Sequence, residues 1–182
     1  MTPFSGGSNK VSGISVTATE KVHITEHHLH HHARWLALAA IPVGETHRAD
    51  RFSPGHASAF QIDAGNDTWG AWVQILGSSD TPISSNALFY DPHLIHISDS
   101  ERNVPYLIQF AHGDSPAIAL ADDEYTEFVY CSVGTGQVAE RMAQQVQTDR
   151  HSVRTKLWAR CFCPGQNTGT LDFYIGLHEY LD

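Results

Sequence analysis

The sequence is short of charge, and the charge it carries is mostly of one sign. Charged residues make up 17% of the 182 residues, and 11 Lys and Arg stand against 20 Asp and Glu, which gives a formal net charge of −9. A nucleic-acid groove needs clustered Lys and Arg, so we expect no nucleic-acid partner.

Long apolar runs are also missing. No window approaches the roughly 18 apolar residues of a membrane span, so we expect no membrane partner. The opening residues, MTPFSGGSNKVSG, lack a charged segment followed by an apolar core, and we expect no signal peptide there.

Cysteine is scarce: the chain has 3, an odd number that cannot all pair within the chain. Cys161 and Cys163 are two apart in an alternating run, which puts both on one face of a strand, where they are poorly placed to bond each other. We therefore expect reduced, buried cysteines in a protein made in a reducing compartment.

Alternating apolar residues dominate the rest of the chain and predict an all-β protein. The clearest case is residues 156–182, where two alternating runs flank a turn rich in Gly, Pro and Asn at residues 164–169. This pattern predicts a β-hairpin. Its apolar positions are Leu157, Ala159, Cys161 and Cys163 in the first run, and Leu171, Phe173, Ile175 and Leu177 in the second.

Shorter runs of the same kind recur at intervals of about 10–20 residues, the pattern of a sandwich or barrel. The length suits one domain, so we predict a single antiparallel, jelly-roll-like β-sandwich over residues 13–182. A flexible Gly/Ser-rich arm is expected at residues 1–12. Further strands are expected at residues 14–19, 59–63, 68–76, 94–98, 105–112 and 126–133.

Two segments leave the secondary structure open. Residues 136–148 place Val138, Met142 and Val146 four apart among good helix formers, which favours one short helix. A long ordered excursion between two strands fits the same residues equally well. Residues 22–42 fit either a short helix followed by a strand or one continuous strand.

Histidines cluster in residues 27–32. On a strand, His28, His30 and His32 would converge on one face, and His-x-His is a metal-binding spacing in β folds. We take these three as candidate ligands of a structural metal ion, against the alternative of a polar, partly exposed segment that binds metal adventitiously. His93 and His96 would face opposite sides of a strand, which favours core or interface histidines.

Tryptophans are candidates for an interface, because aromatic residues are enriched at protein–protein contacts. Trp69 and Trp72 lie three apart in one expected strand, so they should point to opposite faces, one to the core and the other to a partner. We expect Trp72 and Trp35 at an interface.

The sequence motifs assemble no catalytic set. There is no G-x-S-x-G to place a nucleophile and no glycine loop to cradle a phosphate. Cys131 has no neighbouring base that the sequence identifies. We therefore expect no enzymatic activity, and no cofactor other than the histidine-bound metal ion considered above.

Two stretches resemble segments of small proteins encoded beside the structural genes of tailed bacteriophages. They are FQIDAGNDTWGAWVQILGSSDTP (Phe60–Pro82) and WARCFCPGQNTGTLDFYIGLHEYLD (Trp158–Asp182), and together they cover about a quarter of the chain. The resemblance implies a virion structural protein that decorates or cements the capsid shell. Proteins of this kind are commonly trimers on a β-sandwich or β-tulip core, often with an N-terminal arm that grips the shell.

The resemblance also implies the partners and the location of the protein. The partners would be the major capsid protein and other copies of this chain, and the location would be the virion, after assembly in the host cytoplasm. Two other hypotheses remain open. One is a cupin-like metal-binding protein or enzyme that uses His28, His30 and His32; the other is a glycan-binding fibre or head module in which Trp72 stacks on sugar rings.

Overall fold

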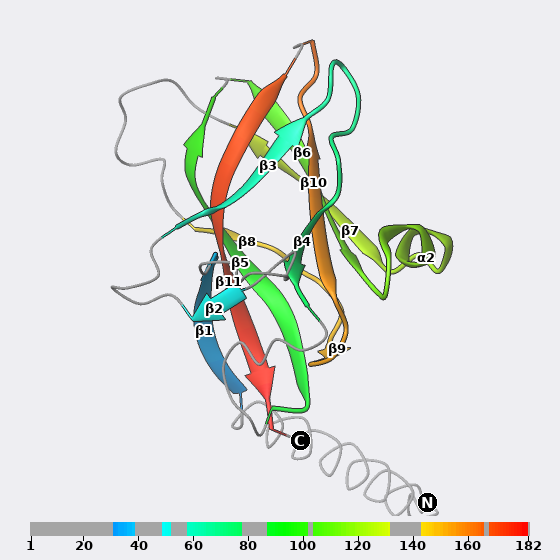
Figure 1. The fold of residues 1–182 in the computed structure, drawn as a ribbon. Helices are drawn as coiled ribbons and strands as arrows, with labels where there is room; N and C mark the ends of the chain where they lie inside the picture. Colours follow the sequence, from blue (N-terminus) through cyan, green and yellow to red (C-terminus); the bar gives the residue numbers. More distant parts are fainter. Residues whose placement is uncertain are drawn as a thin grey trace, which may run out of the picture.

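The computed structural model describes residues 31–38, 49–51, 58–77, 87–101, 104–131, 143–165 and 168–181. The expected arm at 1–12 and the strand expected at 14–19 lie outside these residues. The expectation of an all-β fold with one short helix is confirmed, and the sheet curls into a half-barrel (Figure 1).

The described strands all belong to one hydrogen-bonded sheet. The elements are β1 (His31–Leu38), β2 (Ala49–Arg51), β3 (Phe60–Ala64), β4 (Val73–Leu76), β5 (Phe89–Ser100), β6 (Pro105–His112), α2 (Pro116–Ala121), β7 (Tyr125–Cys131), β8 (Gln144–Gln145), β9 (His151–Ser152), β10 (Leu157–Phe162) and β11 (Gly169–Tyr180).

Strand β11 is the centre of the sheet. Along one edge it pairs antiparallel with β5 over nearly its whole length, and along the other it pairs first with β3 and then with β1. Figure 1 shows β11 running diagonally through the molecule with β5 and β1 beside it. The order continues from β3 through β10 and β6 to β7.

The expected hairpin between residues 157–163 and 171–177 is wrong in its pairing. Both strands form, but β3 lies between them: it pairs antiparallel with β11 and meets β10 in parallel at Cys161 and Ala64. Alternation predicted which residues face the core, but it carries no information on which strand pairs with which.

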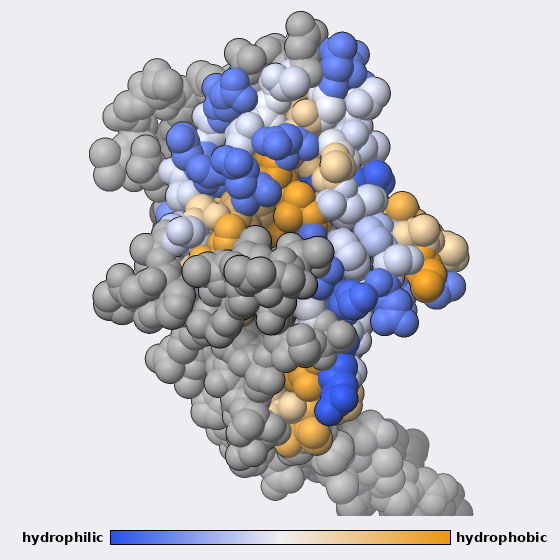
Figure 2. All heavy atoms as spheres, viewed as in Figure 1, coloured by the Kyte–Doolittle hydropathy of each residue, from blue (hydrophilic) through white to orange (hydrophobic). Residues whose placement is uncertain are grey.

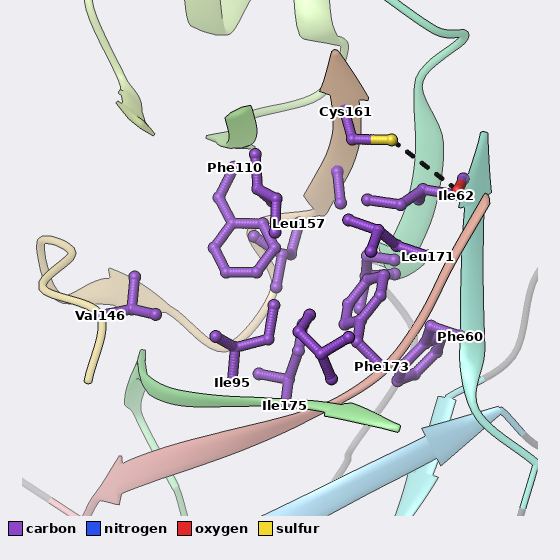
Figure 3. Packing of buried hydrophobic residues seen from close by; sticks show 14 of the residues in the cluster. Phe60, Ile62, Ile95, Phe110, Val146, Leu157, Cys161, Leu171, Phe173 and Ile175 are labelled. Carbon is purple, nitrogen blue, oxygen red and sulfur yellow. Dashed lines mark hydrogen bonds between the residues drawn. The ribbon is translucent and has the colours of Figure 1, made fainter. Parts of the chain in front are cut away.

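The core lies between the curled strands. In Figure 3, side chains from β3, β5, β6, β10 and β11 converge on one cluster, including Phe60, Phe110 and Phe173. The rings of Phe60 and Phe173 stand 5.8 Å apart, and those of Phe110 and Phe173 6.4 Å apart. All eight alternating positions predicted for residues 157–177 are buried, as expected: Leu157, Ala159, Cys161, Cys163, Leu171, Phe173, Ile175 and Leu177.

A β-bulge changes which residues of β5 face the core. Leu94 pairs with Gly176 and Pro92 with Leu177, so His93 is an extra residue opposite a regular stretch of β11. The core-facing positions therefore switch from Tyr90 and Pro92 to residues 95 and 97.

The helix of the described residues, α2, is not the one expected from residues 136–148. Ser115 caps α2 by accepting a hydrogen bond from the Ile118 backbone N–H at 3.4 Å, and Pro116 begins the first turn. This Ser-Pro pair is a helix-start signal. Residues 143–148 form no helix and include β8, and residues 136–142 lie outside the described part of the chain.

In residues 22–42, the described residues 31–38 form strand β1. The strand expected at 68–76 is shorter, because β4 begins only at Val73. Among the described residues, no helix is long and apolar enough to cross a membrane.

Removing the ring at the centre of the core should cost much of the stability. We expect Phe173→Ala to lower the free energy of unfolding by about 3–5 kcal/mol, because it leaves a cavity where three aromatic rings meet. Urea denaturation followed by circular dichroism measures this change. The control is Leu88→Ala, since Leu88 is 53% exposed, and it should change the free energy by no more than about 0.5 kcal/mol. Equal effects of the two substitutions would contradict the assigned core.

Candidate functional site

The face of β10, β6 and β7 that is turned away from the core carries three rows of cross-strand neighbours. We call these residues the outer face. The rows are Trp158, Ala111 and Tyr125; Arg160, Gln109 and Glu127; and Phe162, Leu107 and Val129. A polar row thus runs between two largely apolar rows.

The polar row is a chain of hydrogen bonds across three strands. Arg160 Nε donates to Gln109 Oε1 at 2.6 Å, and Gln109 Nε2 donates to Glu127 Oε1 at 2.8 Å. Gln109 is only 2% exposed, so its amide needs both partners. The row holds the Arg160 side chain in one orientation.

Two tryptophans lie against the guanidinium of Arg160. Its Cζ stands 4.5 Å from the ring centroid of Trp69 and 4.3 Å from that of Trp72, both cation–π distances. The expectation that Trp69 and Trp72 occupy opposite faces of one strand is therefore wrong. Both precede β4, in a segment without strand geometry, which frees them from strict alternation.

A close backbone approach positions these tryptophans. The Gly70 N–H donates to the Cys161 carbonyl at 2.9 Å. A Cβ at Gly70 would lie 1.6 Å from the Asp63 carbonyl oxygen, so no side chain fits here. The adjoining turn is tied to the β10–β11 turn by a bond from the Gly165 N–H to Asp67 Oδ1 at 3.0 Å.

Exposed apolar side chains extend this surface at its β7 end. Val129 and Tyr125 are 51% and 39% exposed, and Ile118 on the neighbouring α2 is 51% exposed. Figure 2 shows hydrophobic residues at the surface where α2 projects on the right. Large apolar side chains exposed together are typical of contact surfaces.

The structure describes only part of the segment whose histidines we expect to bind metal. His28 and His30 lie outside the described residues. His32 belongs to β1, where its backbone pairs with that of Glu179, but its side chain is outside the description. Their role as metal ligands stays a prediction.

A different histidine cluster lies on the side of β5 and β11 away from the core. The rings of His93 and His178 stack with centroids 3.5 Å apart and planes 10° apart. His178 Nδ1 lies 3.4 Å from Asp91 Oδ1, and the Tyr180 hydroxyl donates to Asp91 Oδ2 at 2.6 Å. Burial and this hydrogen bond raise the pKa of the Tyr180 hydroxyl, so it remains a donor.

His96 lies on the same side as His93, so the expectation of opposite sides is wrong. Its ring stands 6.4 Å from that of Tyr174 and 6.4 Å from that of Trp35, in an edge-on contact with the latter. The bulge at His93 supplies the reason, because one extra residue reverses the alternation. Trp35 and Trp72 are both half-buried, and their role at an interface stays a prediction.

A second stacked pair joins the buried His112 to the half-buried His151. The rings of His112 and His151 have centroids 3.8 Å apart, and Tyr90 stands 6.0 Å from His112. Burial, aided by the neighbouring His151, lowers the pKa of His112 to about 3. Burial also lowers the pKa of His151, while Glu124, Asp149 and Asp91 act in the opposite direction.

The buried thiols have low chemical reactivity. Cys161 and Cys163 are buried thiols, as expected for core residues. Cys161 Sγ donates to the Ile62 carbonyl at 3.8 Å (Figure 3), and burial raises the pKa of its thiol to about 12. A thiol that stays protonated is a poor nucleophile.

Comparisons with known proteins give no relative for this chain. No protein-family model matches it, and neither a curated protein nor a solved structure is significantly similar to it.

Arg160 should be the most sensitive residue of the outer face. We expect Arg160→Met to lower the free energy of unfolding by about 2–3 kcal/mol, because it removes two cation–π contacts and leaves the buried Gln109 oxygen without its donor. Urea denaturation measures the loss. Arg154→Met is the matched control, since Arg154 is exposed, and it should change stability by less than about 0.5 kcal/mol. A loss no larger than that of the control would contradict the described contacts.

His112 should make the fold sensitive to acid. Its pKa is about 3 when folded and near 6.5 when unfolded, so between these values the unfolded chain binds a proton that the folded chain does not. Stability is therefore full above pH 6.5 and falls, by up to about 1.4 kcal/mol per pH unit, as the pH drops toward 3.

The substitution His112→Phe keeps a stacked ring but removes this proton. We expect the slope of unfolding free energy against pH, measured between pH 6.5 and 4.5, to be shallower in His112→Phe than in the natural chain. Identical slopes would show that His112 takes up its proton in the folded state. His151 contributes a slope of the same sign in both chains, because burial lowers its pKa as well.

Proposed function

We propose that this chain is a virion structural protein of a tailed bacteriophage, one that decorates the capsid shell. In this proposal the outer face of β10, β6 and β7 contacts the shell, and copies of the chain act together as an oligomer, a trimer by the resemblance of its segments. The protein acts through binding and catalyses no reaction.

The observation that carries the proposal is where the two phage-like segments meet. Trp69 and Trp72 come from the first segment, and Arg160 and Phe162 from the second; the Arg160 guanidinium lies on both tryptophans, and Trp69 stands 6.0 Å from Phe162. The stretches that resemble phage proteins thus meet at Arg160 and Phe162 of the outer face.

The chemistry of the outer face favours a protein partner. Tryptophan, tyrosine, phenylalanine and arginine are the residues enriched at the centres of interfaces. Here Trp158, Arg160 and Phe162 of β10 share the face with the exposed Tyr125 and Val129 of β7. A surface of this kind offers apolar area with a few polar groups that fix orientation.

Side chains of the outer face are already held in place before a partner binds, and this favours tight binding. Arg160 is held by Gln109 and by two tryptophan rings before any partner arrives. Less side-chain entropy is then lost on binding, so more of the contact energy appears as affinity.

Symmetry would turn such contacts into stabilisation of a shell. A ligand that binds the assembled lattice and not its dissociated subunits shifts the equilibrium toward the lattice. An oligomer that engages several capsomers at once binds far more tightly than one copy, because its later contacts are intramolecular.

Mass spectrometry of purified particles tests the first step, and we expect this polypeptide at high copy number. Purified protein is then added to particles that lack it. We expect the natural chain to sediment with them and to raise the temperature at which they release DNA. Val129→Glu should weaken this binding by at least about tenfold, because it places a charge in the contact.

Leu88→Glu is the matched control, since Leu88 and Val129 are 53% and 51% exposed but only Val129 belongs to the outer face. It should bind as the natural chain does. Absence of the polypeptide from particles would reject the proposal. Equal binding by Val129→Glu and the natural chain would remove the outer face from it.

A further inference from the structure

We propose that Asp91, His93 and His178 form a binding site for one divalent transition-metal ion. This inference is independent of the role proposed for the outer face. The donor atoms of the three side chains lie within 4.8 Å of one another, and they come from two paired strands.

The strands create this constellation through the β-bulge. Asp91 pairs directly with His178, which brings a carboxylate beside an imidazole. The extra residue, His93, then stacks its ring on that of His178 at 3.5 Å. In regular pairing His93 would stand directly opposite Gly176; in the bulge it has no pairing partner on β11 and lies between the paired residues Pro92 and Leu94.

The separations suit ligands of a single ion. Two ligands about 2.0–2.2 Å from a zinc ion stand roughly 3.3 Å apart in a tetrahedral arrangement. His178 Nδ1 and Asp91 Oδ1 are already 3.4 Å apart. The longest separation in the group, up to 4.8 Å, can close through rotation of the side chains that carry the donor atoms.

A hydrogen bond behind Asp91 orients its carboxylate. The Tyr180 hydroxyl donates to Oδ2 at 2.6 Å, which leaves Oδ1, the atom nearer His178, to face the ion. Such outer partners fix the geometry of metal ligands and raise affinity. Tyr180 is itself held by Arg150, whose Cζ lies 4.9 Å from its ring centroid.

The donor set selects the class of metal. Two imidazole nitrogens and one carboxylate oxygen suit Zn²⁺, Co²⁺, Ni²⁺ or Fe²⁺, whereas Mg²⁺ and Ca²⁺ prefer oxygen ligands alone. Three protein ligands leave at least one coordination position for water or another ligand. His178 is the more exposed of the Asp91–His178 pair, with side-chain exposures of 28% and 15%, so an ion can reach the site from solvent.

The test must separate this site from the histidines of residues 27–32. We therefore compare the full natural chain, without an affinity tag, with a full-length variant in which His27, His28, His30, His31 and His32 are all replaced by Asn. Both are titrated with Co²⁺ and followed by the visible absorption of the bound ion. We expect the replaced variant to retain one strongly bound Co²⁺ per chain.

Single substitutions in that variant then assign the ligands. His93→Asn and His178→Asn should each weaken Co²⁺ binding by more than about a hundredfold, and Tyr180→Phe by about tenfold. His96→Asn is the matched control, because His96 lies on the same strand and side but contacts Trp35 and Tyr174. It should leave the affinity and the spectrum unchanged.

Thermal unfolding without metal verifies that each variant folds. If a histidine variant is unstable, Tyr180→Phe still tests the site, because this substitution keeps the aromatic packing. Binding that disappears when only residues 27–32 are replaced would overturn the inference. Equal losses in His96→Asn and His93→Asn would overturn it as well.

Discussion

The pairing of β5 with β11 is the constraint on which the rest of the structure depends. These two strands pair from Phe89 with Tyr180 to Ser100 with Leu171, and β11 also carries β1 and β3 on its other edge. The side-chain period of a strand is two, so a slip of one residue would turn every core position outward. His93, the extra residue of the bulge, shifts the core-facing positions of β5 by one residue. The alternation of β11 continues unchanged past this point.

The same pairing divides the molecule into regions with different chemistry. On β5 and β11, the surface away from the core carries imidazoles and a carboxylate. On β10, β6 and β7, the surface away from the core carries an arginine that lies against two tryptophans. In both regions the polar groups stand on paired strands and are held by neighbouring side chains. Groups held this rigidly keep their geometry when a ligand arrives, which is the condition for selective binding.

Much of the fold could be predicted from the sequence, because burial follows a local pattern. The alternation of residues 157–163 and 171–177 identified core positions, and the runs at 59–63 and 105–112 became strands β3 and β6. The pairing could not be predicted, because the insertion of β3 between β10 and β11 depends on contacts about a hundred residues apart. Strand alternation contains no sign of a bulge, so it wrongly predicts opposite sides for His93 and His96.

The candidate sites, like the fold, could be predicted from the sequence only in part. Aromatic composition pointed to Trp72, but only the fold brings Trp69 to the other side of Arg160. The densest histidine pattern in the sequence is residues 27–32, whereas the sequence signal of the second cluster is only the Asp-x-His of Asp91 and His93. Its third member, His178, lies 85 residues further along the chain than His93, beyond the reach of any spacing rule.

The central place of β11 has a consequence for biosynthesis. About 105 residues separate Ala64 from its pairing partner Gly169, so β3 leaves the ribosome well before β11 exists. At the usual rate of elongation this delay is roughly 5–20 s, during which the edges of β1, β3 and β5 have no central strand to cover them. Nascent chains in that interval present open strand edges to one another, and crowding on a single messenger RNA therefore favours mispairing between neighbours. Slower initiation, or a chaperone that shields nascent strands, should raise the yield of folded protein without changing its final stability.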